Sequence, residues 1–209
     1  MRQSACLELA ALCLWGLSAA GVAASLQGRG PNVQDFAVHV VASGNNRGLP
    51  FLVVDKVQAR VWIFTAQGRT LGQSAALLGL ALGDDSVPGI GERALESIRP
   101  EERTTPAGRF ASHLGLNLQG QVVVWVDYDS GLSLHRAIVG LPQEHRAQRL
   151  ASATPLDNRI TYGCINVPAR FFQQLVMPTL RTHGGIVYVL PETRPANQVF
   201  SFLLGVDVR

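Results

Sequence analysis

The segment 159–168 surrounds a cysteine, Cys164, in a setting that suits nucleophilic chemistry. It reads Arg-Ile-Thr-Tyr-Gly-Cys-Ile-Asn-Val-Pro, so the thiol follows a glycine and lies between polar residues. A nucleophilic thiol must be partly exposed and shifted towards thiolate. Gly163 lets the backbone turn tightly, and the turn amides around Gly163 and Cys164 would form an oxyanion hole. Pro168 marks the first turn of a helix, whose N-terminus would favour negative charge on the sulfur. The segment predicts a catalytic cysteine.

A thiol nucleophile of this kind needs a base, and histidine is the usual one near neutral pH. The sequence offers five: His39, His113, His135, His145 and His183. His135 ends a run of alternating apolar residues, a position that would fix its imidazole at the mouth of a sheet. His145 is closer to the cysteine along the chain but lies in a charged, helix-like segment. His135 is therefore the predicted base, and His145 stays open as the alternative.

The chain resembles the L,D-transpeptidases with the YkuD-type catalytic domain in three blocks, which occur in the right order. Residues 51–72 resemble the opening hairpin of that family, and Thr-Pro-Ala-Gly-Arg-Phe at 105–110 matches its Thr-Pro-x-Gly-x-Phe signature. His135 followed by Thr-Tyr-Gly-Cys-Ile-Asn at 161–166 resembles its strand-borne histidine and its Ser/Thr-His-Gly-Cys-apolar-Asn/Arg motif. The resemblance spans roughly residues 50–190. The chain departs from the pattern at Tyr162, where the motif has a second histidine, and at Arg136, where a small residue is more usual.

This resemblance implies an enzyme that acts on the stem peptides of peptidoglycan. The thiolate of Cys164 would attack the carbonyl before the terminal D-alanine, and His135 would protonate the leaving amine. An amine of a second stem would then resolve the thioester. The remaining site residues that the resemblance implies are the loop and oxyanion residues Thr161, Tyr162 and Gly163 and the substrate-binding residues Asn166, Arg159 and Arg136. No cofactor is implied, and no metal, because no His/Cys/Asp/Glu cluster has ligand spacing.

Other functions stay open beside this one. The first is a cysteine hydrolase of the same wall, either an L,D-carboxypeptidase on this fold or a papain-like peptidase. In papain-like enzymes the cysteine precedes the histidine, whereas here it follows. The second is a non-catalytic envelope-binding protein that has kept the fold, which Tyr162 and the long segment 136–159 make credible. The arginines of that segment would bind the carboxylates of an acceptor stem or merely solvate a surface helix.

Composition is consistent with a folded envelope protein. Apolar residues make up 47% of the chain and charged residues 16%, which favours a packed core over disorder. The net charge of +3 comes almost wholly from arginines scattered along the chain. Nucleic acid is therefore not an expected partner. A mildly basic surface suits an anionic envelope polymer, and the expected oligomeric state is a monomer.

Residues 1–24 read as an export signal, which predicts a periplasmic or cell-envelope location. Arg2 gives a positive start, an apolar run follows, and Val-Ala-Ala at 22–24 resembles a cleavage site. An uncleaved membrane anchor is the alternative, since the run approaches the length that spans a bilayer. Cleavage would remove Cys6 and Cys13 and leave Cys164 as the single cysteine.

The pattern along the chain predicts one mainly β domain, an L,D-transpeptidase-like sandwich or barrel with two or three short peripheral helices. Strands are expected at 51–55, 60–64, 71–78, 121–128, 132–135 and 186–190. Short helices are expected at 92–98, at 143–150 and from Pro168 to Pro178. The expected organisation is a signal peptide at 1–24, a flexible lead-in at 25–48 with a short strand at 36–41, a catalytic domain at 49–192 and a tail at 193–209.

Overall fold

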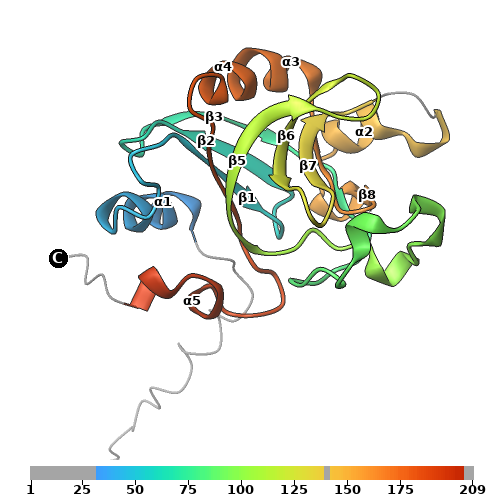
Figure 1. Ribbon diagram of the computed structural model, residues 1–209, viewed down its shortest axis with the longest axis horizontal. Helices are drawn as coiled ribbons and strands as arrows, with labels where there is room; N and C mark the ends of the chain where they lie inside the picture. The colour runs from blue at the N-terminus through green and yellow to red at the C-terminus, as the bar shows by residue number, and fades with distance from the viewer. Residues whose placement is uncertain (1–31, 139–141, 205–209) are drawn as a thin grey trace, which may run out of the picture.

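The computed structural model describes residues 32–138 and 142–204 and consists mainly of one strongly bent β-sheet (Figure 1). Eight strands lie in the order β3-β2-β1-β10-β5-β6-β7-β9. They are β1 (Phe51–Asp55), β2 (Arg60–Phe64), β3 (Thr70–Ala75), β5 (Gly108–Leu116), β6 (Val122–Asp127), β7 (Leu132–Arg136), β9 (Ile165–Val167) and β10 (Gly185–Val189). A separate parallel pair joins β4 (Leu78–Gly79) to β8 (Arg159–Thr161). The predicted mainly β fold class is confirmed, as are the strands expected at 51–55, 60–64, 121–128, 132–135 and 186–190. The strand expected at 71–78 ends at Ala75, because Leu78 belongs to the separate pair. Strands β5, β8 and β9 were not expected from the sequence.

The central strands β1 and β10 are buried on both faces, which explains their unbroken apolar sequences. Because successive side chains of a strand point to opposite faces, each of these strands contributes side chains to two cores. Leu52 and Val54 of β1 contribute to a core on the side of the α3–α4 helix, and Phe51 and Val53 contribute to a second core on the side of α1. The sheet is thus the middle layer of the domain.

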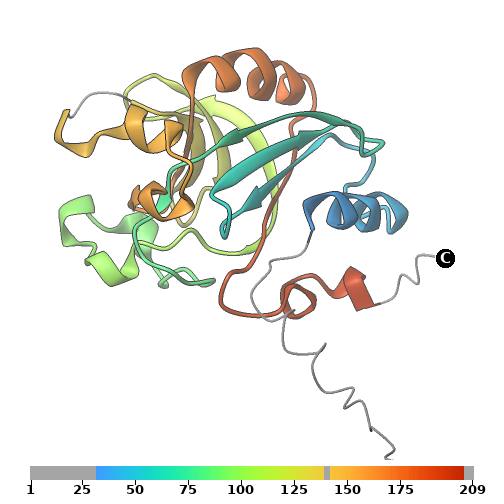
Figure 2. The ribbon, with the colours of Figure 1, turned by 180° about the vertical axis from the view of Figure 1, so that it is seen from behind.

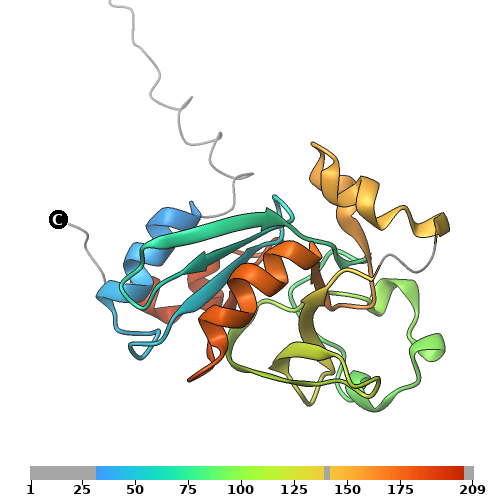
Figure 3. The ribbon, with the colours of Figure 1, turned by 90° about the horizontal axis from the view of Figure 1, so that it is seen from above.

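The first core joins the two ends of the sheet. Val61 of β2, Val124 of β6 and Leu134 of β7 share it with Phe172 and Val176 of the α3–α4 helix. That helix is continuous from α3 (Ala169–Phe171) through a π-type segment, η8 (Phe172–Val176), to α4 (Met177–Leu180). Seen from above, it lies between the β1–β3 side and the β6–β7 side of the sheet (Figure 3). The sheet therefore folds over a shared interior like a sandwich.

The expected end of this helix at Pro178 is wrong, since the helix runs on to Leu180. A proline inside a helix lacks the N–H that would bond to the preceding turn. Here the residues before Pro178 already bond in the wider π pattern, and such a bulge accommodates the local change in hydrogen bonding.

The predicted strand at 36–41 is also wrong, because this segment belongs to helix α1 (Val33–Ala42). Asn32 caps the helix by accepting a hydrogen bond from the Gln34 amide at 2.9 Å. Val33, Phe36 and Val40 recur at helical spacing and are buried in the second core. From residue 32 on, the expected lead-in is thus part of the packed domain.

The second core continues into the C-terminal segment. Phe36 contacts Tyr188 of β10 and Phe200 edge to face, with ring centroids 5.4 and 5.0 Å apart. Phe200 follows α5 (Ala196–Val199) and precedes η9 (Ser201–Leu204). Seen from behind, α1 and the α5 segment lie on the side of the sheet away from the α3–α4 helix (Figure 2).

The remaining short helices lie on the rim. They are η3 (Ile90–Glu92), η4 (Leu95–Ser97), η5 (Pro100–Glu102), η6 (Pro142–Glu144), α2 (Arg146–Ala151) and η7 (Pro155–Asn158). The helix expected at 92–98 is only a pair of 3₁₀ turns, whereas the one expected at 143–150 is present as η6 and α2. No helix in the described ranges is long and apolar enough to cross a membrane. The expected signal at 1–24 lies outside those ranges, so it and the domain boundaries stay predictions.

We predict that α1 contributes substantially to stability through Phe36. Its side chain is 2% exposed, so Phe36→Ala should lower the free energy of unfolding by about 3–5 kcal/mol through lost burial and a residual cavity. Val38 of the same helix is 53% exposed, and Val38→Ala should change that free energy by less than about 1 kcal/mol. Urea unfolding measures both. Equal effects of the two substitutions would show that α1 is not part of the core.

Candidate active site

The position of Cys164 follows from the parallel pairing of β7 with β9. In this register His135 lies opposite Asn166, one step after Leu134 opposite Ile165. Cys164 comes just before β9 and therefore lies beside the middle of β7. Its Sγ is 3.5 Å from Ser133 Oγ and 3.6 Å from the Gly131 carbonyl oxygen. The thiol is partly exposed, as a nucleophile requires.

Gly163 shapes the turn that carries the cysteine. Its φ of +134° lies in a region that side-chain-bearing residues rarely adopt. A Cβ there would lie 2.7 Å from the Thr104 carbonyl oxygen. The turn therefore packs directly against the backbone at Thr104, and only glycine allows this approach.

Two threonines hold this turn by hydrogen bonds. Thr105 Oγ1 donates to the Gly163 carbonyl at 2.7 Å and accepts from the Gly79 amide at 2.8 Å. Thr161 Oγ1 donates to the Cys164 carbonyl at 2.7 Å and accepts from the Gly163 amide at 3.1 Å. The Gly163 amide is thus already engaged within the turn, which leaves the Cys164 amide as the better candidate for an oxyanion donor.

The imidazole of His135 is held at both nitrogens. Nδ1 lies 2.9 Å from the Arg136 carbonyl oxygen, and Nε2 lies 3.0 Å from Nδ2 of Asn166. The Oδ1 of Asn166 in turn accepts a hydrogen bond of 2.5 Å from Nη1 of Arg146. A backbone carbonyl therefore orients the imidazole, as a third group orients the base in a catalytic triad.

The thiol and the imidazole shift each other's protonation. Burial by itself would raise the pKa of Cys164, but the hydrogen bond and charge of His135 and the hydrogen bonds of Ser133 outweigh it, so the pKa is lowered. Burial by itself would lower the pKa of His135, but the hydrogen bond and charge of Cys164 outweigh it, so the pKa is raised. Both shifts favour proton transfer from sulfur to imidazole.

Two cavities meet at the sulfur. One, of about 100 Å³, is lined by the loop at 86–98 and by Ser130 and Gly131, and the other, of about 320 Å³, is lined by His135, Ile138, Glu144 and Arg146. Leu95, Tyr162 and Cys164 line both. Leu95 is 58% exposed and Tyr162 39% exposed, and Arg103 stacks on the Tyr162 ring at 3.9 Å. The thiol is therefore accessible from two sides.

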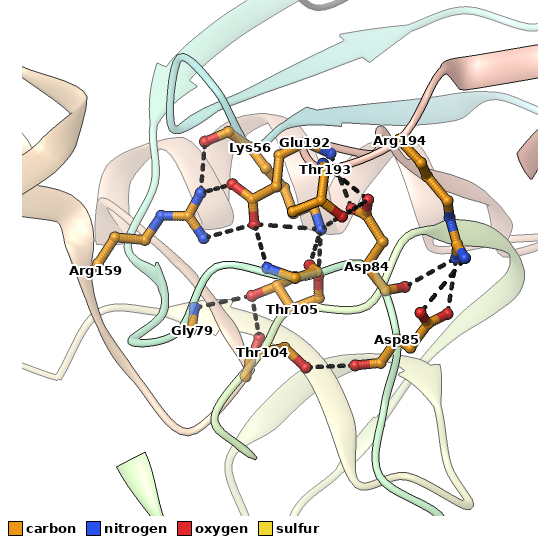
Figure 4. Close-up of polar contacts among 12 residues, drawn as sticks. Lys56, Gly79, Asp84, Asp85, Thr104, Thr105, Arg159, Glu192, Thr193 and Arg194 are labelled. Atoms are coloured by element: carbon orange, nitrogen blue, oxygen red, sulfur yellow. Dashed lines mark hydrogen bonds and ion pairs between the residues drawn. The ribbon is translucent and has the colours of Figure 1, made fainter. Parts of the chain in front are cut away.

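A buried ion network supports the turn from behind (Figure 4). Lys56 Nζ donates to Asp84 Oδ1 at 2.7 Å and to the Thr105 carbonyl at 2.9 Å. Glu192 also faces Lys56, at 3.5 Å, and pairs with Arg159. Burial lowers the pKa of Lys56, against the opposing effect of the two carboxylates. The network fixes the backbone of Thr105, whose hydroxyl binds the turn at Gly163.

The structure brings some of the predicted site residues together and not others. Cys164, His135, Thr161, Tyr162 and Gly163 form one site. Asn166 lies in it too, but it is 1% exposed and its amide is engaged by His135 and Arg146, so it faces the base rather than open solvent.

Two predicted substrate-binding arginines lie elsewhere. Arg159 pairs with Glu192 and lines a different cavity, and the Arg136 side chain is exposed while its carbonyl oxygen holds the imidazole. His145 is exposed and lines neither cavity at the sulfur. The expected helix N-terminus at the thiol is wrong, because β9 separates Cys164 from the helix that starts at Ala169.

Three contributors escaped the sequence reasoning. Ser133 lies two residues before His135, and strand alternation could have placed both on the same face. Lys56 is the only lysine of the chain, which makes it conspicuous, but the sequence does not indicate which carboxylates it would contact. The contact of Arg146 with Asn166 has no sequence signal. Within the described ranges, no group of three or more His, Cys, Asp or Glu residues could hold a metal ion.

Comparison with known proteins gives similar folds only. No family model and no curated protein matches the sequence. The catalytic domain of an L,D-transpeptidase from E. faecium is 19% identical, with a TM-score of 0.37 over 66% of this chain and 95% of that one. The helical cell shape determining protein Pgp2 from Campylobacter jejuni is 13% identical, with a TM-score of 0.45 over 78% of this chain. The match spans 56% of the length of Pgp2.

We predict that Lys56 is essential for stability. Lys56→Met leaves the buried Asp84 without its cation, whereas Glu192 keeps Arg159, and should lower the free energy of unfolding by about 3–5 kcal/mol. The matched control is Arg194→Met, because Arg194 pairs with Asp85, whose side chain is 80% exposed. The control should cost no more than about 1 kcal/mol. Urea unfolding of both variants measures this, and similar losses would contradict the role of the network.

The same network predicts acid sensitivity. Burial alone would raise the pKa of Asp84, but hydrogen bonds from Lys56 and Thr193 lower it far below its usual range. A carboxylate with a lowered folded pKa contributes stability above its unfolded pKa, about 3.9, and loses it as the pH falls further. The free energy of unfolding should therefore decrease below about pH 4. This decrease should be shallower in Asp84→Asn, measured by urea unfolding between pH 2 and 6, and parallel curves would refute the assignment.

Proposed function

We propose that the protein is a cysteine-dependent acyltransferase of the cell wall, an L,D-transpeptidase acting on peptidoglycan stem peptides. The observation that supports it is a thiol that lines two cavities and whose pKa is lowered by His135, an imidazole held by the Arg136 carbonyl. Together with the motif resemblance around Cys164, this favours acyl transfer through a thioester. In this proposal residues 1–24 direct export and the protein works in the periplasm or cell envelope.

The reaction has two half-steps. Cys164 Sγ gives its proton to His135 and attacks the carbonyl carbon before the terminal D-alanine, and the Cys164 amide donates to the developing oxyanion. The C–N bond then breaks, D-alanine leaves with the proton from His135, and a thioester remains. An acceptor amine loses a proton to His135 and attacks the thioester, which forms the new amide and returns the thiol.

Two cavities at one sulfur favour transfer over hydrolysis, because a donor acyl group and an acceptor amine can then be bound at the same time. Binding both partners turns the second step into an intramolecular-like reaction, with effective concentrations up to roughly 10⁵–10⁸ M. We assign Tyr162, with Leu95, to the ridge between the two cavities. Tyr162 replaces the second histidine of the family motif, and its ring would contact both substrates.

His135 should act as the base. His135→Ala should slow acylation of Cys164 by tetrapeptide stems at least about 100-fold, since a general base typically contributes that much. His145→Ala is the control, because His145 is exposed and lines neither cavity, and it should leave the rate nearly unchanged. Intact-mass measurement of the thioester over time gives both rates. The reverse ranking would move the base to His145.

The products test the proposed function. Incubation of the purified protein with tetrapeptide stems should release D-alanine and yield cross-linked dimers, and Cys164→Ala should abolish both. Mass spectrometry identifies the products and the thioester on Cys164. Tripeptide alone, at every acceptor concentration, would make the protein an L,D-carboxypeptidase. No thioester and no product, together with retained binding of the stems, would make it a non-catalytic envelope-binding protein.

A further inference from the structure

Arg146 reaches the site from a segment outside the resembling motifs. It is the first residue of α2, and its guanidinium bonds on one side to Glu144 Oε2 and on the other to Asn166 Oδ1, each at 2.5 Å. The side chain of Arg146 is only 17% exposed. Glu144 thus holds the guanidinium in place against Asn166, and hydrogen bonds from a charged donor are stronger than those between neutral groups.

This contact fixes which way the Asn166 amide points. A guanidinium can only donate hydrogen bonds, so the amide must turn its oxygen towards Arg146. The NH₂ group then faces His135 Nε2 at 3.0 Å. Because NH₂ is a donor, the Nε2 that faces it must accept and carry no proton. The proton of the neutral ring lies on Nδ1, where the Arg136 carbonyl accepts it at 2.9 Å.

We propose that Arg146 is a positioning residue that, by orienting the Asn166 amide, keeps His135 Nε2 free of a proton and so holds the neutral imidazole in its Nδ1–H tautomer. The inference rests on the proposed function for its catalytic meaning. The motif resemblance gives no role to the segment between His135 and Cys164, whereas here Arg146 of that segment orients Asn166. Arg146 also lines the larger cavity, but this role needs no contact with substrate, because it acts through Asn166.

The charged groups around His135 act in opposite directions. Cys164, from the turn before β9, favours the protonated imidazole and raises its pKa, whereas Arg146 on α2 lowers it. Glu144 on η6 pairs with Arg146. Arg136, on the same strand as His135, has an exposed side chain. Loss of Arg146 removes a positive charge and frees the amide to turn its oxygen towards Nε2–H, and both changes raise the pKa of His135.

The test measures His135 by NMR in the full chain carrying Cys164→Ala, so that the thiol does not titrate with it. In this background the ¹⁵N shifts should show Nε2 unprotonated and Nδ1 protonated. Adding Arg146→Met should raise the titration midpoint of His135 by on the order of one pH unit. Arg146→Lys keeps the charge and one donor and should restore most of the original midpoint.

Arg149→Met is the matched control. Arg149 lies on the same helix and donates to the carbonyls of Glu144 and Asp157, so its loss loosens the segment without touching Asn166. It should leave the midpoint unchanged. In an Asn166→Ala background, Arg146→Met should move the midpoint much less than it does when Asn166 is present, because the orienting effect passes through the amide.

Four outcomes would overturn the inference: an Nε2–H tautomer in the Cys164→Ala protein, an unchanged midpoint in Arg146→Met, an equal shift in Arg149→Met, or an undiminished shift without Asn166. The first needs no further substitution, so the inference stays testable if a variant does not fold. None of these measurements uses turnover. If the product assay fails but the titration is as expected, only the proposed function is refuted. If the expected products form but the titration differs, only the role of Arg146 is refuted.

Discussion

The parallel pairing of β7 with β9 is the constraint on which the site depends. β9 is only three residues long, and Ile165 and Val167 are completely buried. Their burial fixes the register, because a shift by one residue would turn both into the opposite face. In this register Asn166 lies opposite His135 and the cysteine reaches Ser133. Two apolar side chains thus determine where Cys164 lies relative to His135.

The turn that presents the thiol is rigid behind and open in front. Behind it, the Gly163 backbone packs against Thr104, and Thr105 is anchored to the buried Lys56 network. In front, exposed Leu95 and Tyr162 border both cavities. A reactive group held by buried polar contacts keeps its geometry while substrates exchange. The buried ion network therefore fixes the part of the structure that positions the thiol.

Protonation of the site reflects a balance between neighbours. Burial and the charge of Arg146 lower the pKa of the imidazole, whereas the thiol raises it. A base whose pKa is too high is already protonated and cannot accept another proton. Efficient bases therefore have a pKa near the working pH. The segment 142–151 thus lowers the pKa of His135 through Arg146, although it lies outside the strands on either side of the candidate site.

The sequence by itself predicted the cysteine turn, the expected base and six of the strands, but missed β5, β8 and β9. Alternating apolar residues revealed the strands because burial of one face imposes that period, and a Gly-Cys pair between polar residues indicated the turn because few other settings suit it. Local pattern misplaced α1, since Phe36, Val38 and Val40 also alternate like a strand. Packing of Phe36 against Tyr188 and Phe200 stabilises this segment as a helix, and the local sequence does not show that packing.

Tertiary structure alone decided the contacts between segments far apart in the chain. Arg159 lies five residues from Cys164 in sequence, yet its charge is taken by Glu192. Arg146 is more distant in sequence and reaches the base through Asn166. A long polar side chain binds whichever complementary group lies within its reach. The packing of strands and loops determines which group that is, and the neighbouring residues in the sequence do not. The residues of the candidate site could be recognised in the sequence, but the contacts that support them could not.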